Sequence, residues 1–218
     1  MTKQALLIGL GRFGMSLARS LAERGVEVLA VDASAKRVEE AADVVSEAAV
    51  FDATDEDELS RAQPAARDLC ICAIGDESHE ASILCTALLR QLGAPRVVSR
   101  ANSKLHARIL HMVGAHEVVN PLEDFGERFA DAFVYERLKG ELPLGDDLVV
   151  AEVEAKTEFV GKTLAELRLP GKYGVTVVAT RSLKGSGVRL PSGTQIIEDK
   201  DVLVVVSKRE ALGKLASD

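Results

Sequence analysis

The chain has 218 residues, of which 47% are hydrophobic and 28% charged, with a formal net charge of −7. This composition supports a buried core in one or two domains, and the acidic balance repels phosphate backbones, so we expect no nucleic acid partner. No apolar stretch approaches the length of about 20 residues that a helix needs to cross a bilayer. The sequence enters a strand-like segment too early for a signal peptide, and its three cysteines lack a disulfide spacing. We therefore expect a cytoplasmic protein.

Short apolar runs alternate with helix-like segments as far as residue 120. The runs are nearly continuous in apolar residues, which is typical of parallel strands covered on both faces. Strand, helix and strand in strict order predict an α/β fold with a Rossmann-like, doubly wound parallel sheet. The predicted strands are Gln4–Leu10, Glu27–Asp32, Ala48–Asp52, Leu69–Ala73, Arg96–Arg100 and Val118–Asn120.

Small polar residues precede several of the predicted helices. A side-chain oxygen at this position accepts hydrogen bonds from the free N–H groups of the first turn. We expect Ser34 to begin the second helix, Thr54 the third, and either Asp76 or Ser78 the fourth.

A helix is predicted from Glu123 to Lys139, with Phe125, Phe129 and Phe133 along one face. Such an aromatic face requires an apolar cover. Two interpretations stay open: the helix packs against the first domain, or it crosses over into a partner subunit.

The rest of the chain changes in character and predicts a small C-terminal α+β domain. The predicted boundaries are residues 1–121 for the nucleotide-binding domain, 122–140 for the crossover helix and linker, and 141–218 for the C-terminal domain. Turn-forming residues predict a linker at Gly140–Asp147 and turns at 184–187 and 191–193. Strands are predicted at Leu148–Val153, Val175–Thr180 and Val202–Ser207, and helices at Thr163–Leu167 and Arg209–Ala216.

The strongest motif is Gly9-Leu10-Gly11-Arg12-Phe13-Gly14, which follows a predicted strand and opens a helix. Gly9 permits a tight turn, Gly11 lets the backbone approach phosphate oxygens, and Gly14 lets helix and strand pack closely. Asp32 ends the second strand at the expected distance, where its carboxylate accepts hydrogen bonds from ribose hydroxyls and repels a 2′-phosphate, which disfavours NADP. A structural glycine turn without a ligand is the alternative.

Further candidates lie at the predicted carboxyl ends of strands, where this fold binds nucleotides. Arg12 and Arg100 are placed to reach phosphates, or else are surface charges. Asp52 lies where the fold meets adenine, or else only starts a helix. The candidate nucleotide-binding residues are Gly9, Gly11, Arg12, Phe13, Gly14, Asp32, Asp52, Ala53, Thr54, Ala73, Ile74, Gly75 and Arg100.

No catalytic constellation is recognisable. All four histidines and all three cysteines precede residue 117, whereas a dehydrogenase usually draws its acid or base from the second domain. Cys70 and Cys72 share one face of a buried strand, which favours packing over zinc binding. We expect a protein that is not an enzyme, with an NAD-dependent oxidoreductase as the alternative.

Several segments together resemble the RCK (regulator of potassium conductance) family of the KtrA/TrkA type. They are residues 9–14, 28–32, 53–56 and 73–75, and, in the C-terminal domain, 172–174 and 198–203. The resemblance covers essentially the whole chain and is specific as a combination.

The resemblance implies a homo-oligomer, a dimer-based octameric ring on a membrane-embedded potassium-translocating subunit of the KtrB/TrkH type, at the inner face of the membrane. It implies ATP, ADP or NAD(H) in the crevice, with nucleotide identity gating ion flow. Arg12 would contact phosphates, Asp32 the ribose, residues 52–54 the base and Arg100 the terminal phosphate. The phenylalanine helix would cross into a dimer partner. A regulator of another transporter class is a further alternative.

Two departures from the family pattern concern ligands. An acidic residue that often follows Pro121 is Leu122 here, so binding of a divalent cation would depend on the neighbouring Glu123 as its ligand. Pro170-Gly171 stands where relatives that bind cyclic di-AMP carry a basic residue, so the sequence does not support that ligand.

Overall fold

The computed structural model describes residues 2–75, 78–145, 147–182 and 187–217. It divides into two compact units, Met1–Asp124 and Phe125–Asp218, which are described separately. Each unit has its own hydrophobic core.

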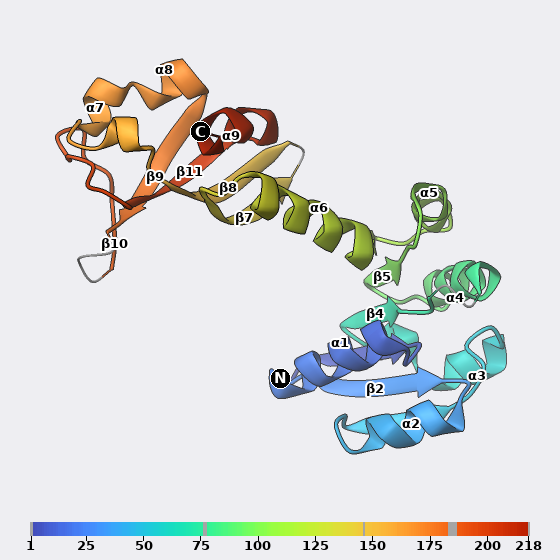
Figure 1. Ribbon diagram of the computed structural model, residues 1–218. Coiled ribbons are helices and arrows are strands. Elements are labelled where there is room, and N and C mark those ends of the chain that lie inside the picture. Colours follow the sequence, from blue (N-terminus) through green and yellow to red (C-terminus); the bar gives the residue numbers. More distant parts are fainter. Residues whose placement is uncertain (1, 76–77, 146, 183–186, 218) are drawn as a thin grey trace. The chain divides into compact units, whose positions relative to one another are not determined.

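The N-terminal unit contains a six-stranded sheet in the order β3-β2-β1-β4-β5-β6. Figure 1 labels β2, β4 and β5 of this sheet, together with helices α1 to α5 of the same unit. All neighbouring strands are parallel. The predicted doubly wound fold is confirmed, and the order reverses between β1 and β4, which is where this fold binds ligands. The strands are β1 Gln4–Ile8, β2 Glu27–Asp32, β3 Glu47–Val50, β4 Leu69–Cys72, β5 Val97–Arg100 and β6 Glu117–Val119.

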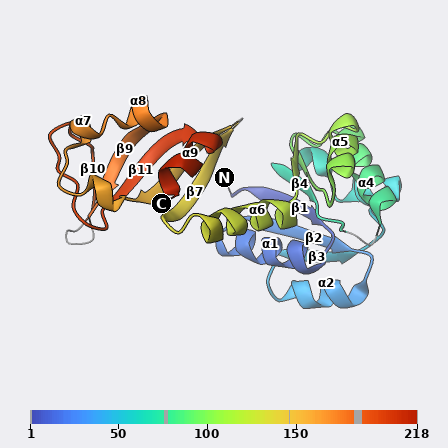
Figure 2. The same ribbon diagram turned by 45° about the horizontal axis from the view of Figure 1, so that its top comes forward.

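Helices cover both faces of this sheet (Figure 2). Leu7 packs on one face with residues of α1 and α2, whereas Leu6 and Ile8 pack on the other with residues of α3 and α4. Because both faces of the sheet are covered, the central strands β1, β2 and β4 are buried almost continuously and do not alternate. The helices are α1 Arg12–Glu23, α2 Ala35–Ala42, α3 Glu56–Arg61, α4 His79–Gln91 and α5 Lys104–Met112.

The helix starts agree only in part with the predictions. Ser78 caps α4 by accepting a hydrogen bond from the Ala81 N–H at 3.1 Å, while Asp76 lies outside the described residues. Ser34 occupies the capping position of α2, but its side chain makes no capping hydrogen bond. The prediction for Thr54 is wrong: Asp55 caps α3.

The C-terminal unit contains a five-stranded antiparallel sheet in the order β10-β9-β11-β8-β7. The predicted α+β class is confirmed, and α9 packs Leu212 and Leu215 into a core with Leu203 and Val205. The sequence did not predict α8 or β10. The elements are β7 Leu138–Gly145, β8 Leu148–Glu154, α7 Leu164–Leu167, α8 Leu169–Tyr173, β9 Val175–Arg181, β10 Val188–Arg189, β11 Val202–Lys208 and α9 Arg209–Ala216.

The predicted linker at Gly140–Asp147 is wrong, because this segment belongs largely to β7. Strand β7 pairs with β8 from Leu138 opposite Val153 to Gly145 opposite Leu148. It is an edge strand, which is where a sheet tolerates a proline such as Pro143.

Helix α6 spans Pro121–Val134, so it begins and ends earlier than predicted. It crosses the division between the two units at 124/125, and the predicted domain boundaries stay predictions. Of the predicted turn at 184–187, only Gly187 lies within the described residues. Within the described chain, none of the helices combines the length and apolar character needed to span a membrane.

Candidate functional site: a nucleotide crevice

The glycine loop connects the end of β1 to the start of α1. Gly9 has a φ of +96°, a conformation that favours glycine, and its N–H donates to the Val31 carbonyl at 2.7 Å. A Cβ on Gly9 would lie 2.8 Å from the Ile74 nitrogen. The loop therefore passes so close to the chain after β4 that only glycine fits.

Gly14 and Gly11 serve different purposes in this loop. A Cβ on Gly14 would stand 1.8 Å from the Gly9 carbonyl oxygen, so this glycine is required by packing. A Cβ on Gly11 would meet no protein atom within 4 Å, and no side chain caps the start of α1. The first turn of α1 thus presents free N–H groups beside open space, which fits a phosphate group.

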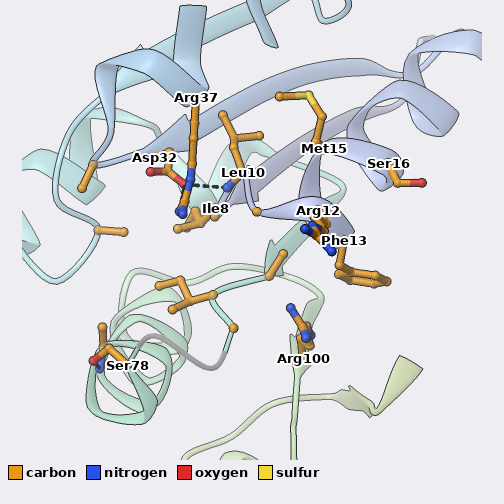
Figure 3. Close-up of a pocket in the computed structure, with 18 of the residues that line it drawn as sticks. Ile8, Leu10, Arg12, Phe13, Met15, Ser16, Asp32, Arg37, Ser78 and Arg100 are labelled. Atoms are coloured by element: carbon orange, nitrogen blue, oxygen red, sulfur yellow. Dashed lines mark hydrogen bonds and ion pairs between the residues drawn. The ribbon is translucent and has the colours of Figure 1, made fainter. Parts of the chain in front are cut away.

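Asp32, at the end of β2, is only 8% exposed and ties the loops of the crevice together (Figure 3). Its Oδ2 accepts a hydrogen bond from the Leu10 N–H at 2.7 Å, and its Oδ1 accepts one from the Ser34 N–H at 2.8 Å. Arg37 lies 3.5 Å from Oδ2. Oδ1 has a further lone pair, so Asp32 can still accept a hydrogen bond from a ribose hydroxyl.

Asp52 also lines the cavity, from the loop after β3, the strand that pairs with β2. Its Oδ1 accepts hydrogen bonds from the Thr54 N–H at 2.9 Å and the Thr54 hydroxyl at 2.8 Å. These bonds, led by the one from the N–H, lower the pKa of Asp52, because they stabilise its ionised form. Thr54 is held facing Asp52, which explains why Asp55 rather than Thr54 caps the next helix.

The other end of the crevice is basic. The Cζ of Arg100 lies 5.6 Å from the centroid of the Phe13 ring, and its Nη1 would lie 2.7 Å from a Cβ on Gly75. Figure 3 shows Arg12 and Arg100 at this end of the cavity, away from Asp32.

These elements enclose a cavity of about 1280 Å³, large enough for a dinucleotide. Every predicted nucleotide-binding residue lines it except Gly14, which lies behind the loop. The cavity is also lined by residues that were not predicted from the sequence. They include Arg37, in the first turn of α2, and Ser16 and Arg19, which follow Arg12 on one face of α1 at helical spacing. The other lining residues that were not predicted are Ile8, Leu10, Met15, Ala33, Glu40, Phe51, Ser78, Ala81, Pro121 and Leu122.

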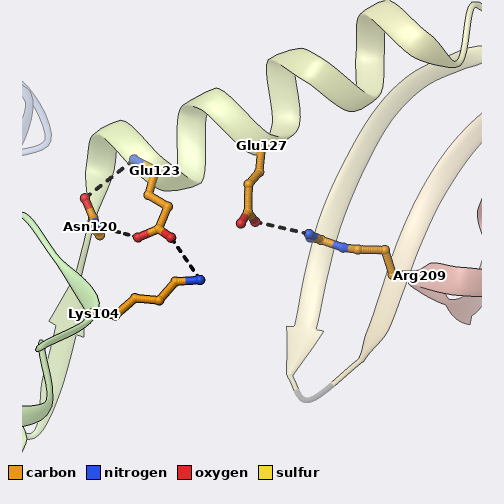
Figure 4. A network of polar contacts seen from close by, with 5 residues as sticks. All are labelled: Lys104, Asn120, Glu123, Glu127 and Arg209. Atoms are coloured by element: carbon orange, nitrogen blue, oxygen red, sulfur yellow. Dashed lines mark hydrogen bonds and ion pairs between the residues drawn. The ribbon is translucent and has the colours of Figure 1, made fainter.

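Glu123, the predicted cation ligand, does not line the cavity. Its Oε1 lies 3.4 Å from the Lys104 Nζ, and its Oε2 accepts a hydrogen bond from the Asn120 Nδ2 at 2.7 Å (Figure 4). A cation beside Glu123 would be repelled by Lys104. Across the described ranges, no group of three or more His, Cys, Asp and Glu side chains is placed to hold a metal ion. The arrangement does not fit a divalent cation at Glu123.

The cysteines and His106 belong to the interior of the N-terminal unit. Cys70, Cys72 and Cys85 are buried, and burial raises the pKa of the Cys70 thiol to about 12, so it is a packing residue. His106 is 4% exposed, and its Nδ1 lies 3.1 Å from the Asn102 Oδ1. Burial first, and the neighbouring His79 second, lower the pKa of His106.

Comparison with known proteins matches both units. Residues 5–121 match the TrkA-N domain and residues 148–217 match the TrkA-C domain. This chain belongs to the TrkA family. The predicted resemblance to regulators of the KtrA/TrkA type is thereby confirmed.

The relatives extend over nearly the whole chain. The Ktr system potassium uptake protein C of Bacillus subtilis is 36% identical over 94% of this chain and 92% of its own length. The Ktr system potassium uptake protein A of Vibrio alginolyticus is 34% identical over 96% of this chain and 94% of its own length.

Among solved structures, the GsuK channel bound to NAD aligns with a TM-score of 0.65 at 18% identity. The alignment covers all of this TrkA-family chain and 40% of that channel, and it supports the fold alone.

Proposed function

We propose that this chain is a nucleotide-sensing regulatory subunit that gates a membrane potassium transporter of the KtrB/TrkH type and is not itself an enzyme. It would act in the cytoplasm, at the inner face of the membrane, through its membrane-embedded partner. Its relatives are named as potassium uptake proteins of Ktr systems, which supports this role.

The observation that carries the proposal is that the two ends of the crevice differ in charge: one end is lined by carboxylates and the other by arginines. One end offers the carboxylates of Asp32 and Asp52, which can accept hydrogen bonds from the ribose hydroxyls and the exocyclic amino group of adenosine. The other end offers Arg12, Arg100 and the uncapped start of α1, which suit phosphates. ADP, ATP and NAD(H) share this pattern of a neutral adenosine joined to anionic phosphates.

Regulation by such a ligand is a shift of population between two shapes of the subunit. A nucleotide favours one shape only by as much as its affinity differs between them, at about 1.4 kcal/mol for each tenfold difference. ATP, ADP and NAD(H) differ only beyond the adenosine, so the arginine end of the crevice would distinguish them. The residues around Glu123 do not fit a divalent cation, so the proposed discrimination rests on the arginines alone.

Helix α6 supports an oligomeric assembly. Phe125, Phe129 and Phe133 are 61%, 64% and 80% exposed, and the first two rings stack at 6.1 Å. A groove of about 340 Å³ lies between this part of α6 and the start of β7, with Phe125 and Phe129 in its wall. A second copy of the same helix would cover these rings, and the resulting dimers would build the octameric ring that the family resemblance implies.

The test is potassium flux through a reconstituted pair. The membrane subunit is placed in liposomes with or without this chain, and potassium uptake is followed with ADP, ATP or NADH. We expect uptake that depends on both the chain and the identity of the nucleotide. Uptake that is indifferent to every nucleotide that the chain binds would overturn the proposal, and steady oxidation of NADH with a hydroxy-acid or carbonyl substrate pair would favour an oxidoreductase.

A further inference from the structure

The Arg100 side chain is positioned by two residues from other segments of the chain. Its guanidinium faces the ring of Phe13, from the first turn of α1 (Figure 3). It also fills the space that a Cβ on Gly75, in the segment after β4, would occupy. The ring and the guanidinium are 5.6 Å apart, within the range of an attractive cation–π contact. All three residues line the cavity.

At position 75, the absence of a side chain leaves room for the Arg100 guanidinium. Gly75 is not among the glycines with a positive φ, so its backbone conformation is open to other residues. A Cβ at this position would lie 2.7 Å from the Arg100 Nη1 and 3.4 Å from its Cζ. A side chain at position 75 would therefore force the guanidinium to move.

The aromatic residue at position 13 is likewise not required by the glycine motif, which leaves this position free. Phe13 is half-buried against the core on one face of the sheet, so its ring has a fixed place from which to hold the guanidinium. An arginine that is held in place before binding loses less side-chain freedom when it meets a phosphate.

We propose that Phe13 and Gly75 are positioning residues, which hold the Arg100 guanidinium at the phosphate end of the crevice and so set how strongly the site distinguishes nucleotides by their phosphates. The proposal rests on the proposed nucleotide function and deepens it. The affinity for adenosine itself would depend on Asp32 and Asp52, and substitutions at Phe13 or Gly75 would leave it unchanged.

The experiment is a double-mutant cycle on the full chain, with dissociation constants measured for adenosine, AMP, ADP and ATP. The variants are Phe13→Leu, Arg100→Gln and the two combined, with Phe13→Tyr as the conservative variant that keeps a ring. We expect Arg100→Gln to weaken ADP and ATP by about tenfold or more and adenosine by less than about twofold. Phe13→Leu should weaken the binding of ADP and ATP by about fivefold, and it should cause almost no further loss once Arg100 is replaced. Phe13→Tyr should retain the affinity of the wild-type chain.

Gly75→Ala is an independent variant that leaves Phe13 in place. It should reproduce the loss for ADP and ATP without a loss for adenosine. Independent, multiplying effects of Phe13→Leu and Arg100→Gln, or equal losses for adenosine and ADP, would overturn the positioning role while leaving the nucleotide function intact. A wild-type chain that binds none of the four ligands would overturn both.

Discussion

The two units of this chain distribute their polar residues differently. In the N-terminal unit the strands are parallel, so all of their carboxyl ends meet at one edge. The loops after β1 to β4 and the last residue of β5, Arg100, line one cavity there. In the C-terminal unit neighbouring strands run in opposite directions, and β8 alternates between buried and partly exposed residues along its length. A parallel sheet thus concentrates binding groups, whereas an antiparallel sheet spreads them over a face.

The largest effect expected from this comparison is a loss of folding in the N-terminal unit alone. Gly14→Ala would place a Cβ 1.8 Å from the Gly9 carbonyl oxygen and force α1 away from the loop. We expect it to lower the free energy of unfolding of this unit by about 3 kcal/mol or more. Urea denaturation measures the change.

Gly11→Ala is the matched control, because its Cβ would meet no protein atom within 4 Å. It should leave the free energy of unfolding nearly unchanged while weakening nucleotide binding. Equal destabilisation by both substitutions would contradict the separation of packing and ligand roles in the loop.

The next effect is on binding at the adenosine end. Asp32→Asn removes the negative charge of the carboxylate that accepts hydrogen bonds from the Leu10 and Ser34 N–H groups. The same carboxylate would bind the ribose hydroxyls. We expect the dissociation constants of ADP, ATP and NADH all to rise at least about tenfold. Titration calorimetry measures them.

Asp68→Asn provides the control for this change. Asp68 also accepts a backbone hydrogen bond, from the Gln4 N–H at 2.7 Å, but it does not line the cavity. Equal losses of affinity in the two variants would show that Asp32 acts through stability and not through the ligand.

In the C-terminal unit, the corresponding test asks whether the exposed phenylalanines of α6 are needed for oligomerisation. Phe129→Asp places a charged carboxylate among the exposed rings of α6. Burying this carboxylate against a second copy would cost desolvation free energy and so oppose association. We expect the molar mass from light scattering to fall. Met112→Asp, at an 83% exposed position on α5, should leave the mass unchanged, and an undiminished mass for Phe129→Asp would contradict the role of α6 in assembly.

The smallest expected effect is a pH dependence from His106. Its pKa is lowered in the folded protein, so the unfolded chain takes up the proton first as the pH falls. Stability that is present above about pH 6.5 should decline below it and level off under the lowered pKa. His106→Gln should flatten this dependence in thermal unfolding, whereas His111→Gln, at an exposed position, should not.

The difference between the two units also explains which parts of the fold and the site could be predicted from the sequence. The N-terminal strands and the loop of Gly9, Gly11 and Gly14 were predictable, because buried parallel strands are uniformly apolar and the loop geometry demands glycine. Arg37 was not, because no pattern separates an arginine that lines a cavity from one on the surface. Thr54 and Asp55 are both suitable caps, and only the hydrogen bonds between Thr54 and Asp52 decide between them.

Strand β7 was missed for a different reason. Gly140, Pro143 and Gly145 are typical of a linker, and the segment becomes a strand because β8 supplies its hydrogen-bonding partner. Tertiary pairing of this kind overrides local propensity, most easily at the edge of a sheet.

The central claim is that the N-terminal crevice binds an adenine nucleotide, and calorimetric titration of the full chain with ADP tests it most directly. The account predicts saturable binding at one nucleotide per chain, with a strong loss on Asp32→Asn and little loss on Asp68→Asn. A folded chain that gives no saturable binding with ADP, ATP or NADH would contradict it.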